Sequence, residues 1–138
     1  MANYEGGCLC GKLRFRVDGA AIDSGYCHCR MCQRNCGSPV VAWTMFAASS
    51  FSWIAGSPTS YASSPEVRRQ FCRNCGSYLV FRRENSTEVS INTASLDDPD
   101  QFPPRSHIFA ESRIPWFHID DDLPRHVGFG PLLPERSE

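Results

Sequence analysis

The sequence has almost no net charge, and it lacks a stretch that could cross a membrane. Its 14 basic side chains nearly balance 15 acidic ones, which leaves a formal net charge of −1. No overall positive field therefore steers the protein toward nucleic acid or an anionic membrane, and we expect neither as a partner. The longest apolar run, Pro39 to Ala48, is interrupted by Thr44 and has about half the length that a membrane-spanning helix needs.

The first residues also lack the pattern of a secretory signal. Met1 to Gly7 contain no basic segment followed by an apolar stretch, and Cys8 comes too early for one to precede it. We therefore expect a cytoplasmic protein whose thiols are reduced. The competing interpretation of the eight cysteines, a set of disulfides, would require an oxidising compartment.

Long helical periods are missing as well, whereas short β segments are frequent. Glycine and proline, ten of each, interrupt the chain at intervals. We expect one mainly β domain over residues 1–138, with an ordered core at about 4–130 and a frayed end at Pro134–Glu138. Apolar and basic residues alternate over Lys12–Val17, which predicts a half-buried antiparallel strand. Val, Ile and aromatic residues predict further strands over Pro39–Phe46, Tyr78–Arg83 and Glu88–Thr93.

Helix is predicted in only two places. One or two turns are expected after Cys29, and a short piece is expected over Ser95–Phe102. Ser95 is suited to cap this second piece, because its hydroxyl can accept a bond from a free backbone N–H. Asp97 and Asp98 would favour its first turn, since negative charge is stabilising at a helix N-terminus.

The eight cysteines group into short clusters whose spacing indicates metal binding. These are Cys8-x-Cys10, Cys27-x-Cys29-x-x-Cys32 with Cys36 close behind, and Cys72-x-x-Cys75. Thiolates one or two residues apart can converge on one tetrahedral zinc ion, whose Zn–S bonds are roughly 2.3 Å long. We therefore expect a zinc protein.

The first and third clusters suit a single closed zinc site. Cys8 and Cys10 in an extended segment would point to the same side, because strand residues two apart share a face. Cys72 and Cys75 suit a tight turn, and Gly76 would allow the positive φ that such a turn needs. Four thiolates leave no open position, so this site is predicted to be structural and to join distant segments.

The middle cluster is where we expect chemistry. Cys27, Cys29 and Cys32 supply three thiolates, so a zinc ion held there keeps one position for water or substrate. The three thiolates give this centre a formal negative charge, and it withdraws little electron density from a bound water. It is better suited to bind an incoming thiol, remove its proton and present the thiolate to an electrophile. This predicts carbon–sulfur bond chemistry.

Cys36 leaves that interpretation open. If Cys32 to Cys36 is helical, the two thiols lie on one face, and Cys36 could close the second site and make it inert. The alternative is a small, partly buried cysteine before Gly37 that binds no metal. The two alternatives predict opposite functions for the middle cluster.

Charged and titratable side chains near the clusters offer further candidates. Basic residues in or beside the clusters are Arg30, Arg34, Arg68, Arg69 and Arg73. They either offset the negative charge of zinc–thiolate centres or bind an anionic ligand. His28 is expected to pack behind the metal rather than transfer protons, and His107 is a better functional candidate than His118.

Separated motifs follow one another along almost the whole chain. They are Gly7–Gly11, Cys27–Arg34 with Gly37, Arg69–Ser77, Ser95–Pro99, Pro104 with His107–Phe109, Pro115–Phe117 and Leu123–Pro124. In this order they resemble the glutathione-dependent formaldehyde-activating enzyme family, which also includes centromere protein V. Cys36 departs from the family pattern, in which we expect a small residue that binds no metal before that glycine.

The resemblance implies a single-domain β-tent fold and two zinc ions per chain. A structural zinc would be held by Cys8, Cys10, Cys72 and Cys75. A second zinc would be held by Cys27, Cys29 and Cys32. The implied activity is that of an S-(hydroxymethyl)glutathione synthase, a carbon–sulfur lyase that adds glutathione reversibly to formaldehyde. The alternative is a binding module for a protein or nucleic acid, in which both zinc ions are structural and nothing is catalysed.

Overall fold

The computed structural model describes residues 2–131, which form two β-sheets and one α-helix. The smaller sheet contains β1 (Asn3–Gly7), β2 (Arg14–Asp18) and β5 (Phe51–Ala55), in the order β1-β2-β5. The strands of the larger sheet are β3 (Asp23–Cys27), β4 (Val41–Ala47), β6 (Thr59–Ser64), β7 (Val67–Phe71), β8 (Tyr78–Arg83), β9 (Glu88–Asn92) and β10 (His107–Ile108). Their order across the sheet is β10-β3-β4-β9-β8-β7-β6.

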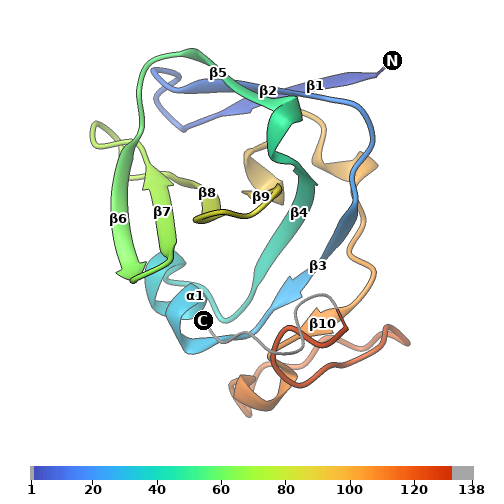
Figure 1. Ribbon diagram of the computed structural model, residues 1–138. Helices are drawn as coiled ribbons and strands as arrows, with labels where there is room; N and C mark the ends of the chain where they lie inside the picture. The colour runs from blue at the N-terminus through green and yellow to red at the C-terminus, as the bar shows by residue number, and fades with distance from the viewer. Residues whose placement is uncertain (1, 132–138) are drawn as a thin grey trace.

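The two sheets are arranged so that the helix lies far from the smaller one. In Figure 1 the three-stranded sheet lies across one end of the larger sheet, while helix α1 (Arg30–Cys36) and β10 lie at the opposite end. Strand β10 runs parallel to β3, and the other strand pairs in both sheets are antiparallel. The prediction of a mainly β fold with antiparallel sheets and little helix is therefore confirmed.

Short 3-10 turns make up the remaining helical structure. They are η1 (Ala48–Ser50), η2 (Thr93–Ser95), η3 (Pro99–Gln101) and η4 (Ala110–Ser112). No helix within residues 2–131 is long and apolar enough to cross a bilayer. The frayed end expected at Pro134–Glu138 lies outside the described residues.

The larger part of the core joins the two sheets, and the alternation in β2 explains how. Phe15 and Val17 have no exposed surface, whereas Arg14 and Arg16, which alternate with them, stay partly exposed. The buried pair packs with side chains from the larger sheet, including Phe46 of β4. Burial of one face of a strand is the expected result of a period of two. The predicted strand is confirmed, with bounds shifted by one or two residues.

The predicted helix over Ser95–Phe102 is found only in part, as the 3-10 turn η3, and residues 96–98 before this turn are not helical. The segment instead crosses the end of β1, where Leu96 pairs with Gly6 and the N–H of Asp97 donates to the carbonyl of Glu5 at 2.9 Å. Ser95 caps no helix, because it lies at the end of η2 and its hydroxyl donates to the carbonyl of Asn92. These tertiary contacts outweigh the weak local preference for helix.

Phe15 offers a direct test of this core. Its ring stacks on Phe51 with centroids 5.5 Å apart and meets the edge of Trp53. We expect Phe15→Ala to lower the free energy of unfolding by about 3–5 kcal/mol, because it leaves a cavity between the sheets. Urea denaturation of the zinc-loaded protein measures this loss. The control Ile54→Ala, in the same sheet at a position 47% exposed, should stay within about 0.5 kcal/mol. Equal losses would contradict this description of the core.

Candidate metal centres

The first cluster has the donor set and the spacing of a tetrahedral zinc site. The four sulfur atoms lie within 4.8 Å of one another and belong to Cys8, Cys10, Cys72 and Cys75. Cys8 Sγ lies 3.6 Å from Cys10 Sγ, which lies 3.8 Å from Cys72 Sγ. A tetrahedral zinc with Zn–S bonds of about 2.3 Å places its sulfurs about 3.8 Å apart. The cysteines are free thiols, and these separations far exceed the roughly 2 Å of a disulfide bond.

Tight turns bring the sulfurs of the first cluster together. The N–H of Gly11 donates to the carbonyl of Cys8 at 3.1 Å, so Cys8 and Cys10 lie in a turn. The expectation that these two cysteines share one face of an extended segment is therefore wrong. At the other pair, Gly76 donates to the carbonyl of Cys72 at 2.7 Å with a φ of +79°. The predicted positive φ of Gly76 is confirmed.

This cluster fastens the two sheets to each other. Cys8 and Cys10 belong to the β1–β2 turn of the smaller sheet, whereas Cys72 and Cys75 belong to the β7–β8 turn of the larger one. Ser77 adds a second link, because its hydroxyl accepts from the N–H of Leu9 at 3.0 Å. Hydrogen bonds from Ser77 also lower the pKa of Cys75 to about 5, which favours the thiolate that a metal requires.

The second cluster lies where β3 passes into α1. Cys27 is the last residue of β3, Cys29 is the N-cap of the helix, and Cys32 lies in its first turn. The N–H of Cys32 donates to Cys29 Sγ at 3.2 Å, so the sulfur takes the place of an oxygen cap. The three sulfurs are buried and lie within 4.8 Å of one another. The predicted short helix after Cys29 is confirmed.

The sulfurs of the second cluster differ in their tendency to ionise. Hydrogen bonds from the thiols of Cys27 and Cys29 lower the pKa of Cys32 to about 3, and the charge of Arg69 acts in the same direction. The pKa of Cys27 is raised by the same contacts with Cys29 and Cys32. Burial, and then the charge of Cys32, raises the pKa of Cys36 to about 11. Cys36 is half-buried and does not belong to the group of three close sulfurs.

Arg69 supplies a buried counter-charge to this cluster. Its side chain is 2% exposed, and its Nη1 donates to Cys32 Sγ at 3.6 Å. The Nε donates to the hydroxyl of Ser63, which fixes the direction of the side chain. The candidate arginines that are exposed are Arg30, Arg34 and Arg73. Two functions were considered for these arginines, to offset the charge of thiolates or to bind an anionic ligand. The contact of Arg69 with Cys32 supports the first of them.

A chain of two histidines and a carboxylate lies behind the second cluster. His28 Nε2 lies 2.8 Å from His107 Nδ1, and His107 Nε2 lies 2.9 Å from the carboxylate of Asp121. His28 is 2% exposed, and its pKa is lowered to about 4 by burial and by the charge of His107. His28 therefore packs behind the cysteines as expected, while His118 is exposed.

Gln33 and Asp121 help to hold this region, although no separate function was predicted for either residue from the sequence. Gln33 donates to the carbonyls of His28 and Ser112 at 2.7 and 3.2 Å, which ties the cysteine loop to η4. Asp121 accepts from His107 and from Arg125. The contacts Gln33–Ser112 and His107–Asp121 join residues 79 and 14 positions apart, so spacing alone could not reveal them.

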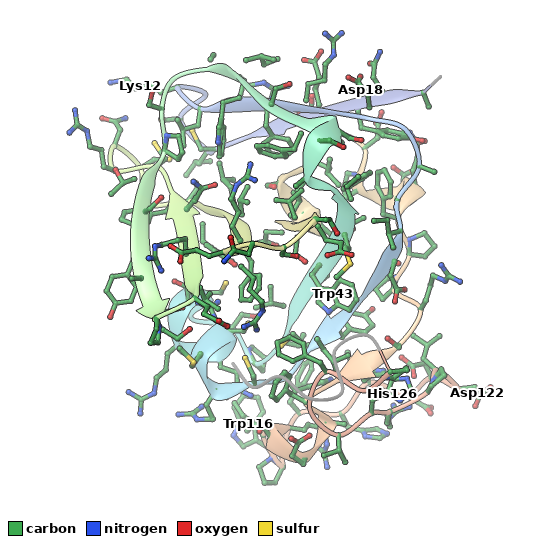
Figure 2. All side chains as sticks on the ribbon, in the orientation of Figure 1. Lys12, Asp18, Trp43, Trp116, Asp122 and His126 are labelled. Carbon is green, nitrogen blue, oxygen red and sulfur yellow. The ribbon has the colours of Figure 1, made fainter. Side chains whose placement is uncertain are left out.

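A pocket of about 70 Å³ opens beside Cys27 and Cys32. The other residues of its wall are Val41, Trp43, Met45, Tyr78, Phe81, Ser90, Ile91, Asn92, Ile108 and Phe129. None of these residues carries a charge. Figure 2 shows one of them, Trp43, beside β3 and β4 in the interior, whereas Trp116 lies at the outer end of the molecule.

Comparison with known proteins gives the family. The sequence profile of the glutathione-dependent formaldehyde-activating enzyme family matches residues 3–112. The chain belongs to this family. The resemblance drawn from the cysteine motifs is thereby confirmed.

Relatives of this formaldehyde-activating enzyme family member come from yeast and bacteria. A Schizosaccharomyces pombe protein described as an uncharacterized lyase is 35% identical over 85 residues, and the match spans 62% of this chain and 61% of that protein. A Halomonas elongata protein, named as a candidate enzyme of the same family, is 26% identical over 84% of this chain and 80% of its own length. A crystal structure of a Rhodobacter sphaeroides protein has the same fold, with a TM-score of 0.57 and 22% identity over 88% of this chain and 98% of that one.

Removing the charge of Arg69 should weaken metal binding at the second cluster. We expect Arg69→Met to reduce zinc affinity there by about 10- to 100-fold, because the buried thiolate loses its donor and counter-charge. Competition with a chromophoric chelator measures this affinity for each zinc separately.

The matched control is Arg68→Met on the same strand. Arg68 is partly exposed and pairs with Glu84 at 2.7 Å, away from the cysteines. The substitution Arg68→Met should leave the zinc affinities of both clusters unchanged. An equal effect of the two substitutions, or a loss confined to the first cluster, would refute the assignment of Arg69.

Proposed function

We propose that this chain is a zinc-dependent carbon–sulfur lyase. It would add a small thiol, glutathione or a similar molecule, reversibly to a small aldehyde such as formaldehyde. The observation that carries the proposal is the group of three buried sulfurs of Cys27, Cys29 and Cys32, which borders an open pocket and includes no fourth donor among the described residues. Membership of the formaldehyde-activating family supports the same type of reaction.

The two clusters would divide structural and chemical functions between them. Zinc at Cys8, Cys10, Cys72 and Cys75 would have its four positions filled by protein sulfur, which is typical of a structural site. Zinc at the second cluster would supply a soft centre that lowers the pKa of an incoming thiol and holds its sulfur. The net reaction breaks the S–H bond of the thiol, forms a C–S bond at the carbonyl carbon and leaves the proton on the carbonyl oxygen.

The chain's own residues would position this chemistry and balance its charge. Arg69 contacts Cys32 from the side of β7, so its charge compensates the thiolate without lining the pocket. Cys27 and Cys32 form part of the pocket wall, so a substrate held there would lie next to the reacting sulfur. Holding two reactants side by side removes much of the entropic cost of a bimolecular reaction.

Cys36 would not bind metal in this proposal, and zinc content tests that point. We expect Cys36→Ser to retain about two zinc ions per chain, whereas Cys32→Ser should retain about one. Elemental analysis of purified protein gives both numbers. Loss of one zinc from Cys36→Ser would mean that four cysteines close the second site, and the lyase proposal would then fail.

The reaction itself can be followed by exchange NMR with glutathione and formaldehyde. We expect the zinc-loaded protein to accelerate interconversion between free formaldehyde and S-(hydroxymethyl)glutathione. Cys32→Ser should return the rate to the uncatalysed value, because the second centre is lost, while Cys36→Ser should remain active. A protein with both zinc ions that accelerates the exchange no more than Cys32→Ser does would exclude this function and leave the binding module as the better assignment.

A further inference from the structure

The pocket beside the second cluster is lined largely by apolar residues, most of them from strands of the larger sheet. Strands β4, β9 and β8 place Met45, Ser90 and Phe81 opposite one another in register. Trp43 adjoins this row on β4, and Ile108 comes from β10. Apart from the sulfurs of Cys27 and Cys32, none of the described wall residues is charged, so the pocket offers no basic side chain to a carboxylate or a phosphate.

The size of the pocket limits what it can hold. Its volume of about 70 Å³ is roughly half that of a protein cavity of about 150 Å³ that accommodates benzene. A short aliphatic aldehyde is therefore a closer match in size than a larger molecule such as an aromatic aldehyde. Formaldehyde has no carbon chain and would leave the apolar walls uncovered.

One buried donor in the wall has no partner. Trp43 is 7% exposed, and its indole Nε1 makes no hydrogen bond to the described residues. The ring is held against β3 because Gly25 has no side chain, and a Cβ there would lie 2.7 Å from Trp43 Cζ2. A buried N–H without an acceptor is destabilising, and buried tryptophans usually find a partner. A neutral acceptor such as a carbonyl oxygen would satisfy this group without bringing a charge into the pocket.

We propose that this pocket selects a short-chain aliphatic aldehyde as the electrophile of the reaction. The alkyl chain would lie against Val41, Met45 and Phe81, and the carbonyl oxygen would accept from Trp43 Nε1. This inference rests on the proposed function, because the aldehyde carbon must meet the thiol sulfur at Cys27, Cys29 and Cys32. The step forms one C–S bond, breaks the thiol S–H bond and moves that proton to the carbonyl oxygen, so it needs no oxidant or reductant.

Inert carbonyl probes can test the pocket apart from the reaction. In the zinc-loaded protein labelled with ¹⁵N, the indole N–H signal of Trp43 is assigned by its loss in Trp43→Phe. We expect butanamide to shift this signal, because the amide carbonyl replaces the missing acceptor. Affinity should increase about fourfold for each methylene from ethanamide to propanamide to butanamide. Benzamide should bind more weakly than butanamide. No shift, an affinity independent of chain length, or stronger binding of benzamide would overturn the inference.

A variant with a larger side chain in the pocket wall tests whether butanamide binds inside the pocket. Ser90→Leu adds an apolar side chain to the wall and should abolish butanamide binding while zinc content stays unchanged. The control is Ser52→Leu, which makes the same change at an exposed position on β5. It should bind butanamide as the unmodified protein does. Equal binding by the two leucine variants would show that the amide lies elsewhere.

Exchange NMR with glutathione then separates this inference from the proposed function. We expect kcat/KM to be at least tenfold higher for butanal than for formaldehyde, and Ser90→Leu should remove the difference. Catalysis of formaldehyde exchange without a preference for butanal would overturn the substrate inference and leave the lyase function in place. Butanamide binding without catalysis of either aldehyde would refute the lyase function and show a carbonyl site unconnected with it.

Discussion

Strand β7 carries Arg69 in its middle and leads directly to Cys72, so one short strand contributes to both cysteine clusters. Arg69 Nη1 lies 3.6 Å from Cys32 Sγ, and Cys72 Sγ lies 3.8 Å from Cys10 Sγ. A buried thiolate without a counter-charge is strongly unfavourable, so the second cluster depends on the guanidinium from β7. Fixing Cys72 in the first cluster holds the strand that delivers this charge. Metal binding at one centre should therefore stabilise the other, although no sulfur belongs to both.

The same arrangement explains how a neutral pocket can adjoin a charged centre. The guanidinium of Arg69 lies 5.3 Å from the ring centroid of Phe81 and 6.0 Å from that of Tyr78. Both aromatic residues line the pocket, whereas Arg69 does not. Cation–π contacts thus hold the charge behind the aromatic wall, where it reaches the sulfur but not the pocket. The region keeps the counter-charge that Cys32 needs and the apolar surface that a carbon chain needs.

The cysteine motifs could be predicted because neighbouring cysteines in each of them lie one or two residues apart. Strand β8 could be predicted from its run of aromatic and β-branched residues. The contact between Arg69 and Cys32 could not, because it spans 37 residues and depends on how β7 pairs with β8. The helix expected at Ser95–Phe102 is reduced to the 3-10 turn η3 for a related reason. Asp97 pairs with Arg14 of β2 at 2.6 Å, and no local rule anticipates this partner. Local chemistry therefore revealed the cysteine groups that could hold metal ions, while their surroundings required the fold.

An apolar wall beside a sulfur-rich centre also suits the chemistry of aldehydes. In water, aldehydes are partly present as hydrates, which offer no carbonyl carbon to a thiolate. A largely apolar pocket favours the free carbonyl form, because the hydrate would place two hydroxyl groups against mostly apolar walls. Trp43 Nε1 is a single donor, which matches one carbonyl oxygen better than a pair of hydroxyls. The pocket would thus act on the aldehyde before the thiol does, by selecting the form that can react.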